Sequence, residues 1–423
     1  MTGILEGIAP RRLGQPFRWL LASSWAGHLG DGIDIAAGPL LVASKTHNPL
    51  LVALALVLQR LPWLLFGLVA GVVADRFDRR RTIIAVGLGR AAVLALLSAM
   101  IMTGRVTITM VLVVMFILGS ADTFADTTAA TLLPMVVDKA DLGIGNARLM
   151  AGFVTVGQLA GPPVGAALFA VGVATPFIVQ TACMLVSAAM AWRITLPAHR
   201  RSTSARSRVR GEIAEGLRWL WSNAPIRTLA LTIVSFNVTF GAAWSVLVLY
   251  ATKRLHTGDL GFGLLTTATA VGGLAGTAIY GRLTARVSLG NIMRVGLLIE
   301  TFTHLALALT TRTWVALVVM LFFGAHASIW GTTSTTVRQR AVPTELQGRV
   351  SSAYLIGVQG GIVAGSAVGG VIAGAWGVTA PFWFAFAGSG VLVVAIWRQL
   401  AHIAHADEAS LRTHGSATGE DGP

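Results

Sequence analysis

Long apolar runs recur along nearly the whole chain, and this feature constrains the fold more than any other. The run at residues 50–74 is longer than the roughly 20 apolar residues that a helix needs to cross the hydrocarbon core of a bilayer. Only helices and closed barrels satisfy their backbone polar groups in lipid, and these runs are too long and too continuous for barrel strands. We therefore predict an all-α polytopic membrane protein with about twelve spans, at approximately 17–44, 50–74, 82–103, 106–133, 149–172, 174–196, 228–251, 261–283, 290–311, 313–337, 350–374 and 380–401.

The distribution of basic residues predicts how these helices are oriented. A formal net charge of +14 would suggest nucleic-acid binding in a soluble protein. Here Lys and Arg gather in alternate short loops, and such residues are retained on the cytoplasmic side. We therefore expect a multi-pass protein of the cell (inner or plasma) membrane with both termini cytoplasmic. Its surroundings are the lipid bilayer, no nucleic-acid partner is expected, and the outside loops hold only Lys45, Arg105, Lys253, Arg254 and Arg312.

Several classes of function are disfavoured by the motifs that the sequence lacks. The one cysteine, Cys183, lies inside an apolar run, so it can form neither an intrachain disulfide nor a cysteine metal cluster. A Gly-x-x-x-x-Gly-Lys-Ser/Thr phosphate loop for ATP is missing, as is any catalytic triad or metal motif with persuasive spacing. Arg11 and Arg12 precede a long run without a cleavage-site pattern, which we interpret as the first membrane helix. The chain is predicted not to be an enzyme and to need no metal or cofactor.

An internal repeat divides the chain into two parts. Residues in two separate blocks recur at one constant offset of 205 residues, which implies two similar six-helix halves related by an axis along the membrane normal. The predicted divisions are an N-terminal half at 1–196, a cytoplasmic linker with an amphipathic segment at 197–227, a C-terminal half at 228–402 and a disordered cytoplasmic tail at 403–423. The matches pair Gly67, Gly71 and Arg81 with Gly272, Gly276 and Arg286, and Gly152, Gly165, Gly172, Pro176 and Phe177 with Gly357, Gly370, Gly377, Pro381 and Phe382.

A charged turn follows the second apolar run. Gly67 and Gly71 are one helical turn apart, so a neighbouring helix could approach the backbone there. Beyond them the order Gly-x-x-x-Asp-Arg-x-x-Arg-Arg resembles the signature between helices two and three of the major facilitator superfamily. Asp78 stands where that family usually has Gly, and acidic residues are familiar there in one drug-exporter branch. The resemblance implies a gating loop made of Gly71, Asp75, Arg76, Arg79 and Arg80, which we expect to latch the cytoplasmic ends of the two halves together.

Two further stretches carry the same resemblance. The loops at 133–146 and 342–350 look like those of the branch that includes macrolide-efflux and enterobactin-export proteins. The fifth run contains a small-residue stripe that is similar to the Gly-Pro signature associated with antiporters. A packing stripe without functional meaning is the alternative, and Pro163 adds a second residue that can bend the helix. The residues of the stripe are Gly157, Gly161, Pro162 and Gly165.

The resemblance implies the major facilitator fold and a secondary active transporter that works by alternating access. The implied activity is export of a small amphipathic compound (a drug, an antibiotic or a siderophore-like molecule) by proton antiport, with the proton gradient in place of a cofactor. A monomer that binds its substrate, protons and lipid is expected. Two alternatives stay open: a facilitator or importer of a small metabolite, and a non-transporting membrane scaffold or sensor. Acids inside the spans argue against the scaffold.

Ionisable residues inside the spans are the candidate transport site, because isolated charge in lipid is costly. His28, Asp31 and Asp34 recur every three residues in the first span, which suggests one shared helical face. The resemblance places the first, fourth, seventh and tenth helices around a central cavity. The carboxylates of Asp31, Asp34, Asp122 and Asp126 would then share this cavity. All four cannot be charged in a cavity of low dielectric constant without cationic partners. We expect a protonation switch at Asp31 and Asp126, tuning by Asp34 and Asp122, and a fixed counter-charge at Arg60.

Each of these acids has a purely structural alternative, namely pairing with Arg60 or Arg90 to hold helices together. The exporter family often carries a buried Arg in its fourth helix, where this chain has Asp122 and Asp126 instead. The ninth helix is usually peripheral in this fold, so packing roles are expected for Glu300 and His304. His326 is expected to be a satisfied core histidine. An aromatic and hydroxylic cavity lining is expected from Trp25, Phe124, Phe236, Phe240, Trp244, Trp330, Thr332, Thr333 and Ser334.

Overall fold

The computed structural model describes residues 11–138, 141–195, 217–342, 346–397 and 399, and every regular element in these ranges is a helix. Ten of the described helices are long and apolar enough to span a membrane. Two more helices occupy the first and last predicted spans. The first carries His28, Asp31 and Asp34, and the last is a shorter apolar helix. This arrangement is consistent with the twelve helices predicted from the apolar runs.

The N-terminal half folds from the first six predicted spans. The fifth span is built from three consecutive segments, α7, η3 and α8. The elements are η1 (Arg11–Leu13), α2 (Gly14–Lys45), α3 (Pro49–Arg76), α4 (Arg79–Met102), α5 (Ile108–Ala129), α6 (Leu133–Val136), α7 (Leu142–Gly152), η3 (Phe153–Ala160), α8 (Gly161–Val171) and α9 (Thr175–Trp192).

The C-terminal half follows the same plan. A short helical stretch at 217–222 precedes it. The elements are α11 (Ala224–Trp244), α12 (Leu247–Leu249), η4 (Tyr250–Arg254), α13 (Gly258–Thr284), α14 (Leu289–Leu309), α15 (Thr313–Ala341), α16 (Gln347–Trp376) and α17 (Ala380–Ile396). Most of the predicted linker and the predicted tail lie outside the described residues, so the predicted domain divisions stay predictions.

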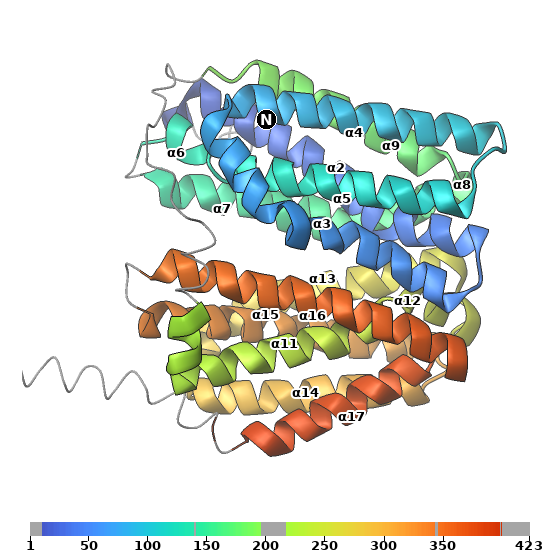
Figure 1. Cartoon of the computed structure of the whole chain (residues 1–423), viewed down its shortest axis with the longest axis vertical. Coiled ribbons are helices and arrows are strands. Elements are labelled where there is room, and N and C mark those ends of the chain that lie inside the picture. The colour runs from blue at the N-terminus through green and yellow to red at the C-terminus, as the bar shows by residue number, and fades with distance from the viewer. Residues whose placement is uncertain (1–10, 139–140, 196–216, 343–345, 398, 400–423) are drawn as a thin grey trace, which may run out of the picture.

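The two halves form separate groups of helices that lie side by side (Figure 1). Within the first group α2 packs against α8 and α9, and α3 packs against α5; within the second, α11 packs against α16 and α13 against α15. Between the groups α3 packs on α16, and α13 packs on α8. When 205 is added to the residue numbers of α3, they fall on α13, and those of α8 fall on the last part of α16. The second contact is therefore the symmetry image of the first, as the predicted repeat requires.

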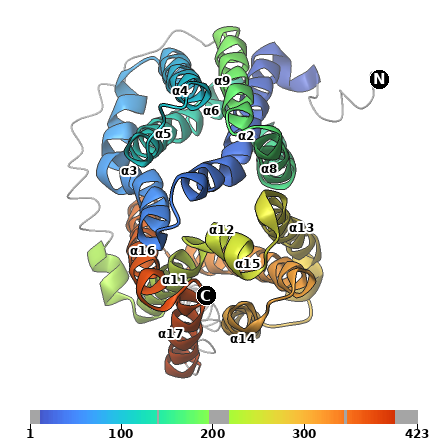
Figure 2. The ribbon, with the colours of Figure 1, turned by 90° about the vertical axis from the view of Figure 1, so that its right-hand side faces the viewer.

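The halves meet closely at one end of the bundle, which carries residues 46–48 and is called here the loop-46 end. A Cβ added at Gly370 of α16 would lie 2.6 Å from Ala53 Cβ of α3, and one added at Gly263 of α13 would lie 2.6 Å from Ala166 Cβ of α8. Lys253 Nζ also donates a hydrogen bond to the His47 carbonyl oxygen, at 3.2 Å. Seen from this end, α12 lies next to the end of α2 (Figure 2). The loop-46 end is therefore the closed one.

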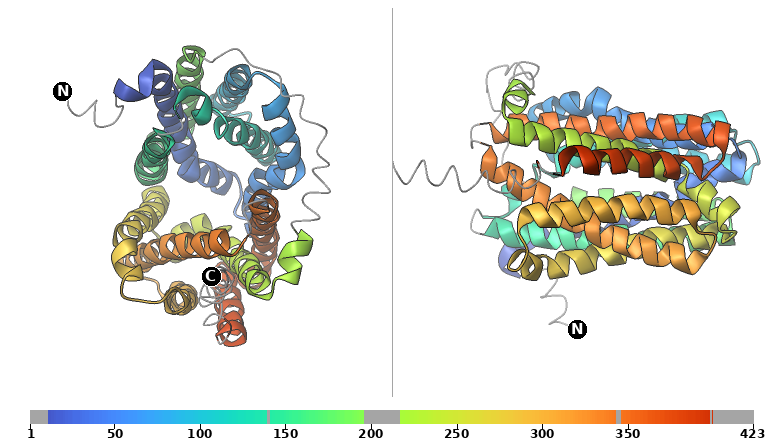
Figure 3. Two further views of the ribbon diagram at one scale, coloured as in Figure 1. Left: turned by 90° about the vertical axis from the view of Figure 1, so that its left-hand side faces the viewer. Right: turned by 90° about the horizontal axis from the view of Figure 1, so that it is seen from below.

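The opposite end carries Arg76 and the other arginines of the charged turn, and is called the Arg76 end. In Figure 1 the ribbons of the two halves draw apart toward it, and Figure 3 (left) shows this end facing the viewer. No neighbouring heavy atom lies within 4 Å of a Cβ added at Gly67 or Gly71. The close approach of a helix that these two glycines would permit is therefore not made in this conformation. Their repeat partners differ, because a Cβ at Gly276 would lie 2.3 Å from the Ala325 carbonyl oxygen of α15.

Candidate functional site

Backbone-to-backbone packing fixes the helix that carries the first acids. A Cβ added at Gly32 of α2 would lie 2.3 Å from the Gly157 carbonyl oxygen, and one at Gly161 would lie 2.4 Å from Gly32 Cα. One at Gly165 would lie 2.3 Å from the Ile33 carbonyl oxygen. The small-residue stripe of η3 and α8 therefore lies directly against the part of α2 between His28 and Asp34, because only glycines permit such close approach.

The stripe also interrupts regular helix geometry. Residues 153–160 form a π-helical segment, and the Gly161 N–H bonds to the Val156 carbonyl oxygen, five residues back. Pro162 and Pro163 follow directly, and neither can donate a backbone hydrogen bond. Helices commonly kink at prolines and at π-helical turns, and π-helical turns are frequent at functional sites. The predicted bend thus takes the form of a widened turn opposite α2.

A buried arginine gathers two of the predicted acids. Arg90 of α4 is only 8% exposed, and its Nη2 lies 3.0 Å from Asp122 Oδ1 of α5. The same Nη2 bonds to Asp31 Oδ1 of α2. One guanidinium therefore ties three helices together. Both carboxylates keep accessible surface, with side chains 40% and 31% exposed for Asp31 and Asp122.

Asp34 lies deeper in the same region. It is 7% exposed, and Gln59 Nε2 of α3 donates to its Oδ2 at 3.1 Å. Its Oδ1 is buried without a hydrogen-bond partner. Gly119 allows this neighbourhood to form, because a Cβ there would lie 2.2 Å from the Gln59 carbonyl oxygen.

Arg60 and Asp126 differ from the buried groups, because both are exposed and yet have charged neighbours. Arg60 of α3 lies within electrostatic range of Asp122 and Asp126. Among the residues that the structure describes, the ion pairs of this region fall on Arg90, so Arg90 joins Arg60 as a counter-charge, and the role of Arg60 as the fixed one stays a prediction. The physical reason that Arg90 makes these pairs is position, since α4 brings Arg90 between α2 and α5 whereas Arg60 lies one residue beyond Gln59 on α3.

The predicted common face of the first span is wrong. His28 lies edge-on to Phe153 of η3 at 5.4 Å between ring centroids, Asp31 meets Arg90 of α4, and Asp34 meets Gln59 of α3. A step of three residues turns a helix by about 300°, so two steps rotate the side chains by about a third of a turn. The three groups consequently reach three different neighbours.

The charges of this cluster do not balance. Asp31, Asp34, Asp122 and Asp126 are four carboxylates, whereas Arg60 and Arg90 supply two guanidiniums. Uncompensated charge within a bilayer is expensive, so the cluster is most stable when protons or a bound cation reduce its negative charge. This arrangement can bind and release a proton, and it can attract a cationic compound.

The charged turn is shaped by Asp78, the residue that departs from the family pattern. Its Oδ1 accepts a hydrogen bond from the Arg81 N–H at 2.9 Å, which caps the start of α4. Arg79 Nε donates to the Ala74 carbonyl oxygen at 3.2 Å, and Arg80 lies over the Trp192 ring at 5.7 Å. These contacts remain within the N-terminal half. The side chain of Asp75 lies outside the described set, so the predicted latch stays a prediction.

A second ionisable cluster was not expected as a unit. Glu300 and His304 of α14 bond through Oε1 and Nε2 at 2.9 Å, and His326 Nε2 of α15 lies 3.4 Å from Glu300 Oε2. The spacing of four residues predicts the first contact. No local pattern connects His326, which is 22 residues beyond His304, so only the packing of α14 on α15 brings it in. The described residues contain no group of three or more acids, histidines or cysteines placed to hold a metal ion.

Several of the aromatic residues predicted to line the cavity pack against one another, and their role as a lining stays a prediction. Phe240 stacks with Trp244 at 4.5 Å between ring centroids, and Trp244 packs on Phe323 of α15 at the same distance. Trp330 and Thr333 are buried, and Trp25 packs against Gly152 while its Nε1 donates to the Arg148 carbonyl oxygen. Phe236, Phe240 and Trp244 of α11 are half-buried, as are Trp25 and Phe124, and Thr332 is exposed.

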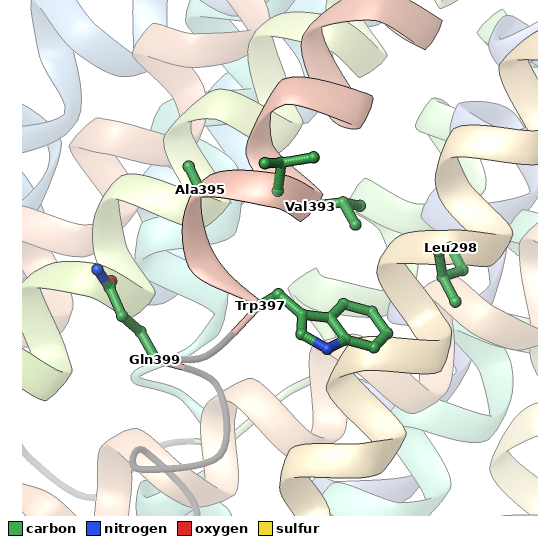
Figure 4. Close-up of a pocket in the computed structure, with 6 residues that line it drawn as sticks. Leu298, Val393, Ala395, Trp397 and Gln399 are labelled. Carbon is green, nitrogen blue, oxygen red and sulfur yellow. The ribbon is translucent and has the colours of Figure 1, made fainter.

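A pocket of about 610 Å³ lies apart from both clusters, between α14 and the end of α17. Leu298 of α14 faces Val393 and Trp397 across it (Figure 4). Its lining contains no acidic residue, and Arg294 lies over the Trp397 ring at 5.3 Å. The pocket is therefore peripheral to the candidate transport site.

Similarity to known proteins agrees with this geometry. The sequence matches the family model described as transmembrane secretion effector over residues 6–418. The chain belongs to this branch of the major facilitator superfamily. It is 30% identical over 352 residues to the multidrug efflux pump Tap of Mycobacterium tuberculosis, a match that covers 79% of this chain and 83% of that one.

Solved structures share the fold at low sequence identity. A point mutant of the nucleoside transporter NupG superposes with a TM-score of 0.77 at 10% identity, over 91% of this chain and 100% of that one. A bacterial homologue of the iron transporter ferroportin in an inward-facing state superposes with a TM-score of 0.74 at 15% identity, over 91% of this chain and 98% of that one. The protein is a multi-pass membrane transporter of the major facilitator type and not an enzyme.

Proposed function

We propose that this transporter exports small amphipathic compounds in exchange for protons. The observation that carries the proposal is the charge cluster on α2, α3, α4 and α5, in which four carboxylates share two guanidiniums. Its solvent-accessible members can take up protons, and an exported cation would compete with those protons for the same negative charge. The similarity to efflux pumps named for multidrug transport supports export over import.

Alternating access supplies the mechanism in this proposal. The halves are closed at the loop-46 end by glycine contacts and diverge toward the Arg76 end, where the compound would enter. Proton binding at Asp31 or Asp126 lowers the local negative charge and releases a bound cation after the halves rock to the other state. The arginine-rich Arg76 end is proposed to be cytoplasmic, following the retention of basic residues on that side, and both termini with it.

Reconstitution tests the proposal directly. Purified protein in liposomes should move cationic amphipathic dyes against their gradient when a pH gradient is imposed. Asp126→Asn should abolish this pH-driven movement while leaving exchange of labelled for unlabelled dye intact, since an amide cannot carry the proton. Ser44→Ala, at an exposed position on α2, is a matched control and should behave like the parental protein. Uphill movement of dye by the Asp126→Asn variant at the parental rate would contradict proton exchange at this site. Dye movement only down its own gradient, unaffected by pH, would instead favour a facilitator.

A further inference from the structure

The C-terminal half contains a buried ionisable cluster that the proposed transport site does not use. Glu300 and His304 are 1% and 0% exposed, and the side chain of His326 is 2% exposed. A carboxylate enclosed in this way is expensive unless it is paired. The only cations within reach are the two imidazoles, because the charge interactions of Glu300 with described residues come from His304 and His326.

The contacts of His304 favour one tautomer of its ring over the doubly protonated form. Its Nε2 lies 2.9 Å from Glu300 Oε1, and its Nδ1 is buried without a partner. A protonated imidazole has two N–H donors, and a buried donor without an acceptor costs free energy. The neutral tautomer with its hydrogen on Nε2 satisfies the donor and leaves only an acceptor unpaired. In that tautomer His304 orients the carboxylate and leaves its charge in place.

The imidazole of His326 faces Oε2 of Glu300, the carboxylate oxygen that His304 does not contact. Glu300 Oε2 and His326 Nε2 are both buried without a hydrogen-bond partner, and they lie 3.4 Å apart. A proton on His326 Nε2 would neutralise the net charge of the cluster and needs only a small movement to bond Oε2. Gly296 makes room for this ring, because a Cβ there would lie 2.9 Å from His326 Nδ1.

Other charged groups on the surrounding helices are engaged elsewhere or lie toward helix ends. Arg294 bonds the Trp397 carbonyl oxygen, Arg227 bonds the Trp221 carbonyl oxygen, and Arg338 lies over the Tyr354 ring. The described part of α17 has no ionisable side chain. Among the side chains that the structure describes, the titratable or charged groups on the other packed elements are Asp259, Tyr280 and Arg282 of α13, Arg312 before α15, and Tyr354 of α16.

We propose that Glu300, His304 and His326 form a second proton-binding site, in which one exchangeable proton resides on His326 Nε2 against Glu300. His326 contacts the rings of Phe236, Phe323 and Trp330 edge-on. Phe236 is half-buried, so a single aromatic layer separates the site from accessible surface. Because Glu300 is on α14 and His326 is on α15, sliding of one helix past the other changes the gap between their unpaired atoms. Such movement would release or recapture the proton.

Histidine NMR tests the binding claim without any transport. Full-length protein in nanodiscs is labelled with 15N-histidine, and the His326 signal is assigned with His326→Gln. His326 Nε2 should carry the exchangeable proton in the parental protein, and Glu300→Gln should lower the charged fraction of the ring at least tenfold. Gly296→Ala keeps all three groups but displaces the His326 ring, so it should lower that fraction too. His47→Gln, in an exposed loop, should leave it unchanged. A neutral His326 in the parental protein, or a charged fraction unaffected by either variant, would overturn the proposal.

Proton counting tests the exchange claim, which rests on the proposed antiport. Glu300→Gln combined with His326→Gln removes both charges together, so the interior stays neutral. In liposomes we measure how many protons cross the membrane in the opposite direction for each dye molecule transported. This number should be lower by about one in the double variant than in the parental protein. An unchanged count would show that the site does not exchange its proton during transport. A parental protein without pH-driven export would refute the proposed antiport instead, while the NMR result would stand by itself.

Discussion

Removing the arginine that joins α2, α4 and α5 should destabilise the fold through the two acids that it leaves behind. Arg90→Gln keeps most of the side-chain volume but removes the charge that Asp31 and Asp122 share. Breaking a buried ion pair by removing one partner costs about 3–5 kcal/mol. Because Asp31 and Asp122 are 40% and 31% exposed, solvent screens part of that cost, and we expect about 2–3 kcal/mol.

A rescue experiment distinguishes charge from packing. The triple variant Arg90→Gln, Asp31→Asn and Asp122→Asn removes all three charges and should recover most of the lost stability, since neutral polar groups cost less than unpaired ions. Thermal unfolding midpoints of detergent-purified protein, followed by tryptophan fluorescence, measure each step. A single variant that melts with the parental protein would refute the reasoning, as would a triple variant that melts no higher than the single one.

Three further predictions follow from contacts in the fold. Gly161→Leu should prevent accumulation of folded protein, because even a Cβ there would lie 2.4 Å from the α2 backbone; yields on size-exclusion chromatography at the parental level would contradict this. Gly71→Leu should fold but slow transport in liposomes, since the open space beside it must close in the opposite state, whereas Gly89→Leu, also without neighbours, should transport normally. Tyr250→Phe should lower the free energy of unfolding by about 1 kcal/mol, because the hydroxyl donates to the buried Leu307 carbonyl oxygen at 2.7 Å. Denaturant unfolding of both proteins measures this loss, and equal midpoints would contradict it.

The sequence predicts the helices and their halves well, because hydrophobic length and a constant repeat offset are local or regular signals. It also predicts which acids lie on these helices. It favours Arg60 as the cation that meets them, and it does not predict that the side chain of Arg90 on α4 reaches Asp31 of α2 and Asp122 of α5. Asp78 shows the converse case, in which a local rule suffices, because an acid three residues before a backbone N–H is a helix cap.

His326 shows why the rest of the site could not be predicted. Its distance along the chain from Glu300 carries no periodic signal, and a lone histidine in an apolar helix is most simply a core residue. Only the tertiary contact of α14 with α15, permitted by Gly296, turns three separate residues into a cluster. The same applies to Gly71, whose surroundings depend on which end of the transporter is closed.

The contacts that close the loop-46 end have a consequence for how the transporter responds to its medium. Gly370 and Gly263 meet methyl groups and backbone, and Lys253 adds a single bond to a carbonyl oxygen. Van der Waals contact is indifferent to dissolved salt, whereas interactions among exposed charges weaken beyond a Debye length of about 8 Å at physiological ionic strength. In the proposed cycle, closure at the Arg76 end moves the arginines of the charged turn toward the C-terminal half, so this step should depend on ionic strength. Salt concentration should accordingly affect closure at the Arg76 end and leave closure at the loop-46 end nearly unchanged. The equilibrium between the two conformations should therefore shift with the ionic strength on the arginine-rich side.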